Sequence, residues 1–140
     1  MRKRTEAEIL APAGTREALT AAVRCGANAV YLGGKLLNAR RNAGNFDAEE
    51  LRRAVEYCHL RGVKVYQTIN IVMFEDEIDE AVETIRTAAA AGVDAVLTQD
   101  LAVARMVRDC APTLPIHAST QMTVHSLDGV KQCADLGMSR

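Results

Sequence analysis

The sequence has little aromatic character and no stretch that could serve as a membrane anchor. It contains no tryptophan, three tyrosines and two phenylalanines among 140 residues. The core must therefore be built from Ala, Val, Leu, Ile and Met. No segment approaches the roughly 18 to 20 consecutive apolar residues that a membrane span needs. The basic start at Met1 is followed at once by Thr5 and Glu6, which excludes an apolar secretory signal there, so we expect a cytoplasmic protein.

A strong excess of one charge is also missing. The formal net charge is −1, and nucleic-acid binding through a general electrostatic surface needs a basic protein. This mode of binding is excluded for the chain as a whole, whereas a local basic patch stays open.

Paired cysteines are absent as well, since no two have metal-clip spacing such as C-x-x-C. Cys58 and Cys133 each precede a glycine by four residues, so they occupy equivalent positions and are expected to pack in the core. We therefore predict no metal site within this chain. The four cysteines all fall near the ends of predicted helices: Cys25, Cys58, Cys110 and Cys133.

An internal repeat is the strongest positive signal. Four times a helix-like stretch ends in glycine and an apolar, strand-like run follows or begins. Glycine suits the position just past a helix because it adopts the left-handed conformation without steric penalty. The repeating glycines are Gly26, Gly62, Gly92 and Gly137.

Strands and helices are predicted to alternate along the chain, which indicates a parallel sheet with right-handed crossovers. Strands are expected near residues 8–11, 27–32, 63–68, 93–98 and 116–121, and a sixth at the chain end. Helices are expected over residues 15–25, 47–61, 75–91, 101–110 and 126–136.

Two folds fit this alternation: a (β/α)8 barrel and an open doubly wound sheet. No G-x-G-x-x-G follows the first strand, and the repeat is uniform, which favours the barrel. A complete barrel typically needs about 250 residues. We therefore expect residues 1–140 to be a single N-terminal segment, the first five units of a truncated TIM-like (β/α)8 barrel. With an open edge, such a segment is expected to self-associate.

Alignment of the repeats on their glycines predicts which strand residues face the barrel interior. Residues two, six and eight positions after each glycine share one face, and we expect this face to point inward. The alternate set, which includes Ala29, Val65 and Ala95, should pack on the helices. The inward set becomes polar near the carboxyl ends of the strands: Thr68, Asn70, Thr98 and Asp100.

The fifth predicted strand, residues 116–121, carries His117, Ser119 and Gln121 on one face. Polar groups make a poor core unless they are hydrogen-bonded. This face is either the catalytic wall of a site or an internal hydrogen-bond network. A serine hydrolase is not favoured, because the two side chains lie about 6 to 7 Å apart along a strand and no G-x-S-x-G occurs.

The segment 33–46, between the second strand and second helix, should lie at the catalytic end of the barrel. Guanidinium groups suit phosphate or carboxylate recognition, although a solvated loop is the alternative. It is not a P-loop, since G-x-x-x-x-G-K-[ST] is absent. His125, after the fifth strand, is a further candidate. The substrate-binding candidates of the loop are Lys35, Asn38, Arg40, Arg41 and Asn45.

Several segments together resemble the start of the peptidase U32 family, in the family's order and spacing, over nearly the whole chain. They are Glu8 to Gly14, Gly26 to Gly34, Asn38 to Arg40 through Asn45 and Phe46, and His117 to Met122. The resemblance implies a barrel-like N-terminal domain. It also implies an enzyme named as a collagenase-like peptidase or one that hydroxylates bases of transfer or ribosomal RNA. Several members hold an iron–sulfur cluster, whose cysteines would lie downstream of this chain.

Three functional hypotheses follow. The first is an RNA-base hydroxylation enzyme, favoured by the basic loop, the polar fifth strand and the lack of a protease engine. The second is a peptidase acting on a peptide substrate, as the family name implies. The third is a non-catalytic scaffold or assembly partner. In all three the 140-residue chain alone is expected to be inactive.

Overall fold

The computed structural model describes residues 7–39 and 44–140. Strands and helices alternate as predicted, and the helix at residues 101–110 has the predicted bounds. The elements are β1 (Leu10–Pro12), α1 (Arg16–Arg24), β2 (Ala29–Gly33), α2 (Ala48–His59), β3 (Lys64–Ile69), η1 (Glu75–Glu77), α3 (Ile78–Ala91), β4 (Ala95–Thr98), α4 (Leu101–Cys110), β5 (Ile116–Ala118), η2 (Thr120–Met122) and α5 (Leu127–Asp135). No helix in these described ranges is long and apolar enough to cross a membrane.

The five strands form one parallel sheet in the order β1-β2-β3-β4-β5. This order has no reversal, which a doubly wound sheet would require, so the barrel arrangement is confirmed. The chain end continues the pattern: Met138 bridges Ile116 in parallel, and the Ala118 amide donates to the Arg140 carbonyl at 2.7 Å. A sixth strand thus begins beside β5, as the repeat predicts.

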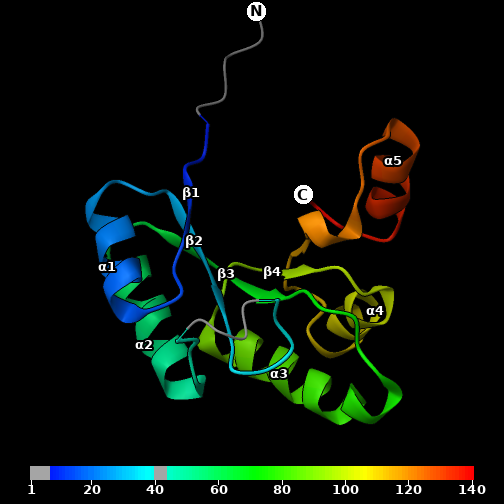
Figure 1. The fold of residues 1–140 in the computed structure, drawn as a ribbon, viewed down its shortest axis with the longest axis horizontal. Coiled ribbons are helices and arrows are strands. Elements are labelled where there is room, and N and C mark those ends of the chain that lie inside the picture. Colours follow the sequence, from blue (N-terminus) through cyan, green and yellow to red (C-terminus); the bar gives the residue numbers. More distant parts are fainter. Residues whose placement is uncertain (1–6, 40–43) are drawn as a thin grey trace, which may run out of the picture.

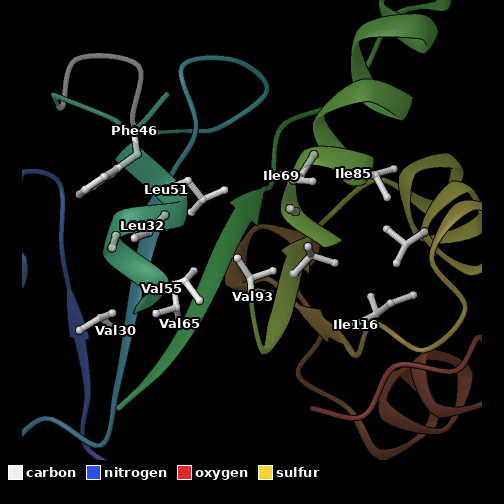
Figure 2. Close-up of a cluster of buried hydrophobic side chains, with 14 of the residues drawn as sticks. Val30, Leu32, Phe46, Leu51, Val55, Val65, Ile69, Ile85, Val93 and Ile116 are labelled. Carbon is white, nitrogen blue, oxygen red and sulfur yellow. The ribbon is translucent and has the colours of Figure 1, made fainter. Parts of the chain in front are cut away.

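Helices α1 to α4 cover one face of the sheet, and α5 stands apart near the C-terminus (Figure 1). The main hydrophobic core lies between these helices and the strands, and Figure 2 shows part of it. Strand residues that contribute to it are Val30, Leu32, Val65, Ile69, Val96 and Ile116.

The opposite face, here called the inner face, carries a second and smaller cluster. Ala29, Tyr66 and Ala95 are buried there, with Leu10, Tyr31 and Leu97 packed against them. The predicted direction of β3 is right, since Val65 faces the helices. For β2 and β4 it is wrong, because Leu32 lies in the helix-side core whereas Ala29 and Ala95 lie on the inner face.

The error comes from strand register. Ala29, three residues after its glycine, pairs with Lys64, two residues after the next glycine. Tyr66, four residues after that glycine, pairs with Ala95, three residues after the third. A shift of one residue exchanges the two faces of a strand, so alignment on the glycines does not preserve direction.

The helix ends follow the predicted chemistry. All four repeat glycines have positive φ, for example 79° at Gly92, which ends α3 in the left-handed conformation. At the start of α2, the Asp47 carboxylate accepts from the Glu50 amide at 2.9 Å, and the Glu50 carboxylate accepts from the Asp47 amide at 2.8 Å. This is the capping box expected from the sequence.

We expect Asp47→Ala to lower the free energy of unfolding by about 1 kcal/mol, because it removes the acceptor for the first amides of α2. Urea denaturation monitored by circular dichroism measures the change. Asp47→Asn is the matched control: it keeps a capping oxygen and should retain most of the stability. Equal losses in both variants would contradict a capping role.

Self-association stays a prediction. β1 lies at one edge of the sheet, and Leu127 and Val130 of α5 are 69% and 55% exposed.

Candidate functional site

A pocket of about 290 Å³ opens on the inner face, at the carboxyl ends of the strands. We call it the inner pocket. Polar residues lie at its rim and apolar residues on its walls, at the end of the sheet where barrel proteins place their sites. It is lined by Leu10, Tyr31, Thr68, Asn70, Leu97, His117, Ala118, Ser119, Thr120 and Arg140.

His117 comes from the middle of β5 and points into the inner pocket. Its neighbours Ile116 and Ala118 pack toward the helix-side core, which confirms the predicted direction of this strand. The imidazole meets the Tyr66 ring edge-on, with centroids 4.8 Å apart. Burial lowers the pKa of His117 below its ordinary value, and the Arg140 guanidinium lowers it further. The imidazole is therefore neutral at neutral pH and has both acceptor and donor capacity.

Ser119 is 6% exposed and lies just after β5. Its Oγ accepts from the Asn70 side-chain amide at 3.3 Å and from the Gln121 backbone amide at 3.3 Å. The serine thus caps η2 while touching Asn70. Among the residues that the structure describes, no hydrogen bond joins Ser119 to His117, so a serine–histidine nucleophile is not formed.

The predicted strand over residues 116–121 is too long. β5 ends at Ala118, and a 3₁₀ turn covers Thr120 to Met122. Gln121 therefore does not share a strand face with His117, and it is exposed. The Ser119 cap causes the change, because a side chain that bonds an amide two residues ahead bends the chain out of a strand.

Asn70 links the inner pocket to the loop between β2 and α2. Its Oδ1 accepts from the Ala39 amide at 3.1 Å, while its Nδ2 donates to Ser119. Asn38 is fully buried and donates to the Gly34 carbonyl. Asn45 has a positive φ of 47°, and its side chain lies with that of Asn38 against Gly33. Both asparagines therefore shape the loop rather than line the inner pocket.

Other predicted substrate-binding residues lie away from the inner pocket. Lys35 pairs with Asp47 at 3.3 Å beside α2. Asp100 caps α4 by accepting from the Ala102 amide at 2.7 Å, and its other oxygen accepts from the Met73 amide at 3.1 Å. His125 is exposed and contacts the Thr123 carbonyl at 3.0 Å. Arg40 and Arg41 fall outside the described residues.

A polar network below His117 was not predicted. The Tyr66 hydroxyl donates to the Glu8 carboxylate at 3.1 Å, and Arg140 forms an ion pair with the same carboxylate. Arg140 lowers the pKa of Glu8, and burial raises the pKa of Tyr66 to about 12. The alternation that places Thr68 inward also places Tyr66 inward, and this was the available signal.

The cysteines do not fit an iron–sulfur cluster. Cys58 and Cys133 are buried, as predicted, whereas Cys25 and Cys110 are exposed. Burial raises the pKa of the Cys58 thiol to about 11, which opposes the thiolate that a metal needs. In the described part of the chain, no group of three or more His, Cys, Asp or Glu side chains could hold a metal ion.

A sequential parallel sheet, helices on one face and a polar pocket at the strand ends define a protein of the TIM-barrel type. The chain belongs to peptidase family U32, whose family model matches residues 14–140.

Two characterised relatives carry different names. A tRNA hydroxylation protein from Bacillus subtilis (strain 168) is 34% identical over 133 residues, which cover 95% of this chain and 32% of that protein. A collagenase from Porphyromonas gingivalis is 34% identical over 125 residues, which cover 89% of this chain and 30% of that protein. The chain thus spans about a third of the length of either relative.

The fold is also shared with a solved structure. The U32 peptidase Mk0906 superposes with a TM-score of 0.73 at 15% sequence identity, over 99% of this chain and 58% of that one.

Proposed function

We propose that the chain forms the substrate-binding wall of an enzyme that hydroxylates an RNA base. The observation that carries the proposal is the inner pocket, where a neutral His117 imidazole faces the same space as the Ser119–Asn70 pair. The tRNA hydroxylation protein of Bacillus subtilis supports this chemistry at 34% identity.

The inner pocket suits one small planar group. Its volume of about 290 Å³ lies near the lower end of ligand sites, roughly 300 to 1,000 Å³. Amide and hydroxyl groups, such as those of Asn70 and Ser119, hydrogen-bond the edges of an unstacked base, and aromatic rings such as Tyr31 give it a stacking surface. A single base turned out of an RNA loop meets these requirements.

Hydroxylation replaces a C–H bond of the base by C–OH, so a proton must leave the reacting carbon. The His117 imidazole can accept that proton, because its lowered pKa keeps one nitrogen free at neutral pH. Ser119 and Asn70 would orient the base. The oxidant, including any iron–sulfur cluster, would be held by other parts of the protein, since the cysteines of this chain do not fit one.

A peptidase is the second candidate, because the Porphyromonas gingivalis relative is named a collagenase. Peptide hydrolysis through Ser119 would need a base within hydrogen-bond reach. Its hydroxyl oxygen instead accepts from Asn70 and from the Gln121 backbone.

The test compares two products in one preparation of the intact protein. We expect nucleosides from RNA treated with the protein, or from cells that carry its gene, to gain the mass of one oxygen atom. We expect no gelatin cleavage. Ser119→Ala should lower nucleoside hydroxylation through weaker base binding, seen as a higher KM. Gelatin cleavage that disappears in Ser119→Ala would establish the peptidase instead, and neither product in any preparation would leave the scaffold hypothesis.

A further inference from the structure

A second pocket, of about 370 Å³, lies on the helix side of the sheet. We call it the outer pocket. It sits between α2 and α3, under the residues that follow β2. Gln67 of β3 lines this pocket, whereas its neighbour Thr68 lines the inner pocket. Successive strand residues point to opposite faces, so the sheet separates the two pockets.

The walls of the outer pocket are apolar. Phe46 and Leu51 are 5% and 2% exposed and belong to the core, while Leu36 is 50% exposed at the mouth. Figure 2 shows Phe46 and Leu51 at the β2–α2 end of the core. A volume of about 370 Å³ falls within the range of small-molecule sites, so a flat apolar body of moderate size can be held here.

The base of the outer pocket holds an unsatisfied amide. Gln67 is 2% exposed, and its Oε1 has no hydrogen-bond partner among the described residues. Buried polar atoms are nearly always paired, and an unpaired one is destabilising. A donor from a ligand would remove this defect. The amide is also held close to the backbone, since a Cβ on Gly34 would lie 3.1 Å from its Nε2.

The rim of the outer pocket is acidic. Glu80 and Glu83 lie three residues apart on α3 and therefore share a helix face. Neither has an ion-pair partner within residues 7–39 and 44–140, whereas Asp47 on the other side is paired with Lys35 at 3.3 Å. The unbalanced charge at the mouth is therefore negative.

We propose that the outer pocket binds a small molecule that carries a protonated amine on a flat apolar body. The body packs against Phe46 and Leu51, the ammonium group faces Glu80 and Glu83, and an N–H donor reaches the Gln67 amide. This site is independent of the reaction proposed for the inner pocket, because no residue is shared between the two linings.

Isothermal titration calorimetry on the intact protein tests the proposal with three probes of one shape. Tryptamine carries the amine, indole-3-acetate a carboxylate, and indole-3-ethanol a neutral hydroxyl. We expect tryptamine to bind and indole-3-acetate to bind at least about tenfold more weakly, because like charges at the rim repel it. The alcohol should fall between the two. Equal affinity for the amine and the carboxylate overturns the proposal.

Variants locate the binding. Gln67→Met and Glu83→Gln should each weaken tryptamine about fivefold to tenfold, the loss expected for one hydrogen bond or close charge. Asp79→Asn is the matched control, because it removes a carboxylate from the same helix outside the pocket lining, and it should leave the affinity unchanged.

Two further variants separate the alternatives. If Gln67→Met does not fold, Gly34→Ala displaces the same amide and should weaken tryptamine in a protein whose circular dichroism is preserved. His117→Ala should leave tryptamine binding unchanged. Binding that is lost in His117→Ala, or retained in both Gln67→Met and Gly34→Ala, places the amine elsewhere and overturns the proposal.

Discussion

In the intact enzyme, His117→Ala is expected to lower kcat about 100-fold or more, within the 10² to 10⁴ that a positioned general base contributes. The cost in stability should be small. The imidazole is half-buried and its ring contact is the edge of Tyr66 at 4.8 Å, and such a pair contributes about 0.5 to 1.5 kcal/mol. Product formation and the melting temperature, measured on the same preparation, separate the two effects.

His117→Phe is the matched variant, because it keeps an aromatic ring beside Tyr66 and removes both ring nitrogens. It should restore the melting temperature without restoring turnover. If His117→Ala prevents folding and His117→Phe is fully active, the imidazole is a packing residue and the base role is refuted.

The pH dependence follows from the direction of the His117 pKa shift. Burial depresses the pKa below the ordinary value of 6.5, so the free imidazole persists into mildly acidic solution. Turnover that depends on this base should hold down to pH 6.5 and fall as pH drops through the lowered pKa. The contribution of His117 to stability has the same sign. It is fully present above 6.5 and is lost as pH falls through the folded pKa, because the unfolded chain binds the proton more readily.

The second large effect is expected in the core. Ile85→Ala should lower the free energy of unfolding by about 2 to 5 kcal/mol, since it deletes three methyl or methylene groups from a fully buried side chain. Ile85 lies in the helix-side core between α3 and the sheet (Figure 2). Urea denaturation with a two-state fit measures the loss.

Arg86→Ala, at the next position of α3, is the control for this experiment. Arg86 is exposed, so its removal should change the free energy of unfolding by less than about 0.5 kcal/mol. A loss below about 1 kcal/mol for Ile85→Ala would mean that α3 is not anchored to the sheet in the manner described.

Much of the fold was predictable because the signals are local. Each glycine that ends a repeat has the positive φ that only glycine adopts readily, and each such turn fixes where a strand begins. The capping box at Asp47 was likewise readable from residues three apart. On α3 the buried stripe is Ala81, Ile85 and Ala88 rather than the larger Ile78 and Val82, because helix–sheet contact selects direction and not size.

The candidate site was predictable in part. His117, Ser119 and Asn70 meet in one pocket, as strand alternation indicated. Lys35 and Asp100 were chosen for their charge, but a helix cap or a nearby carboxylate engages each of them. Gln121 was misplaced because a serine cap ended the strand early. Such competition among short-range hydrogen bonds is decided by geometry that residue types alone do not give.

The offset between neighbouring strands also determines the shape of the site. When each strand is displaced along its neighbour, the strands must tilt relative to the barrel axis, by about 36° in folds of this type. Residues at equal distance from their glycines then stand at different heights around the axis. β3 accordingly raises both Thr68 and Asn70 to the inner pocket, whereas β4 supplies Leu97 alone. The floor of the pocket therefore slopes, with its polar side on β3 and β5 and its apolar side between them, so a planar ring is expected to enter with one edge toward Asn70 and Ser119.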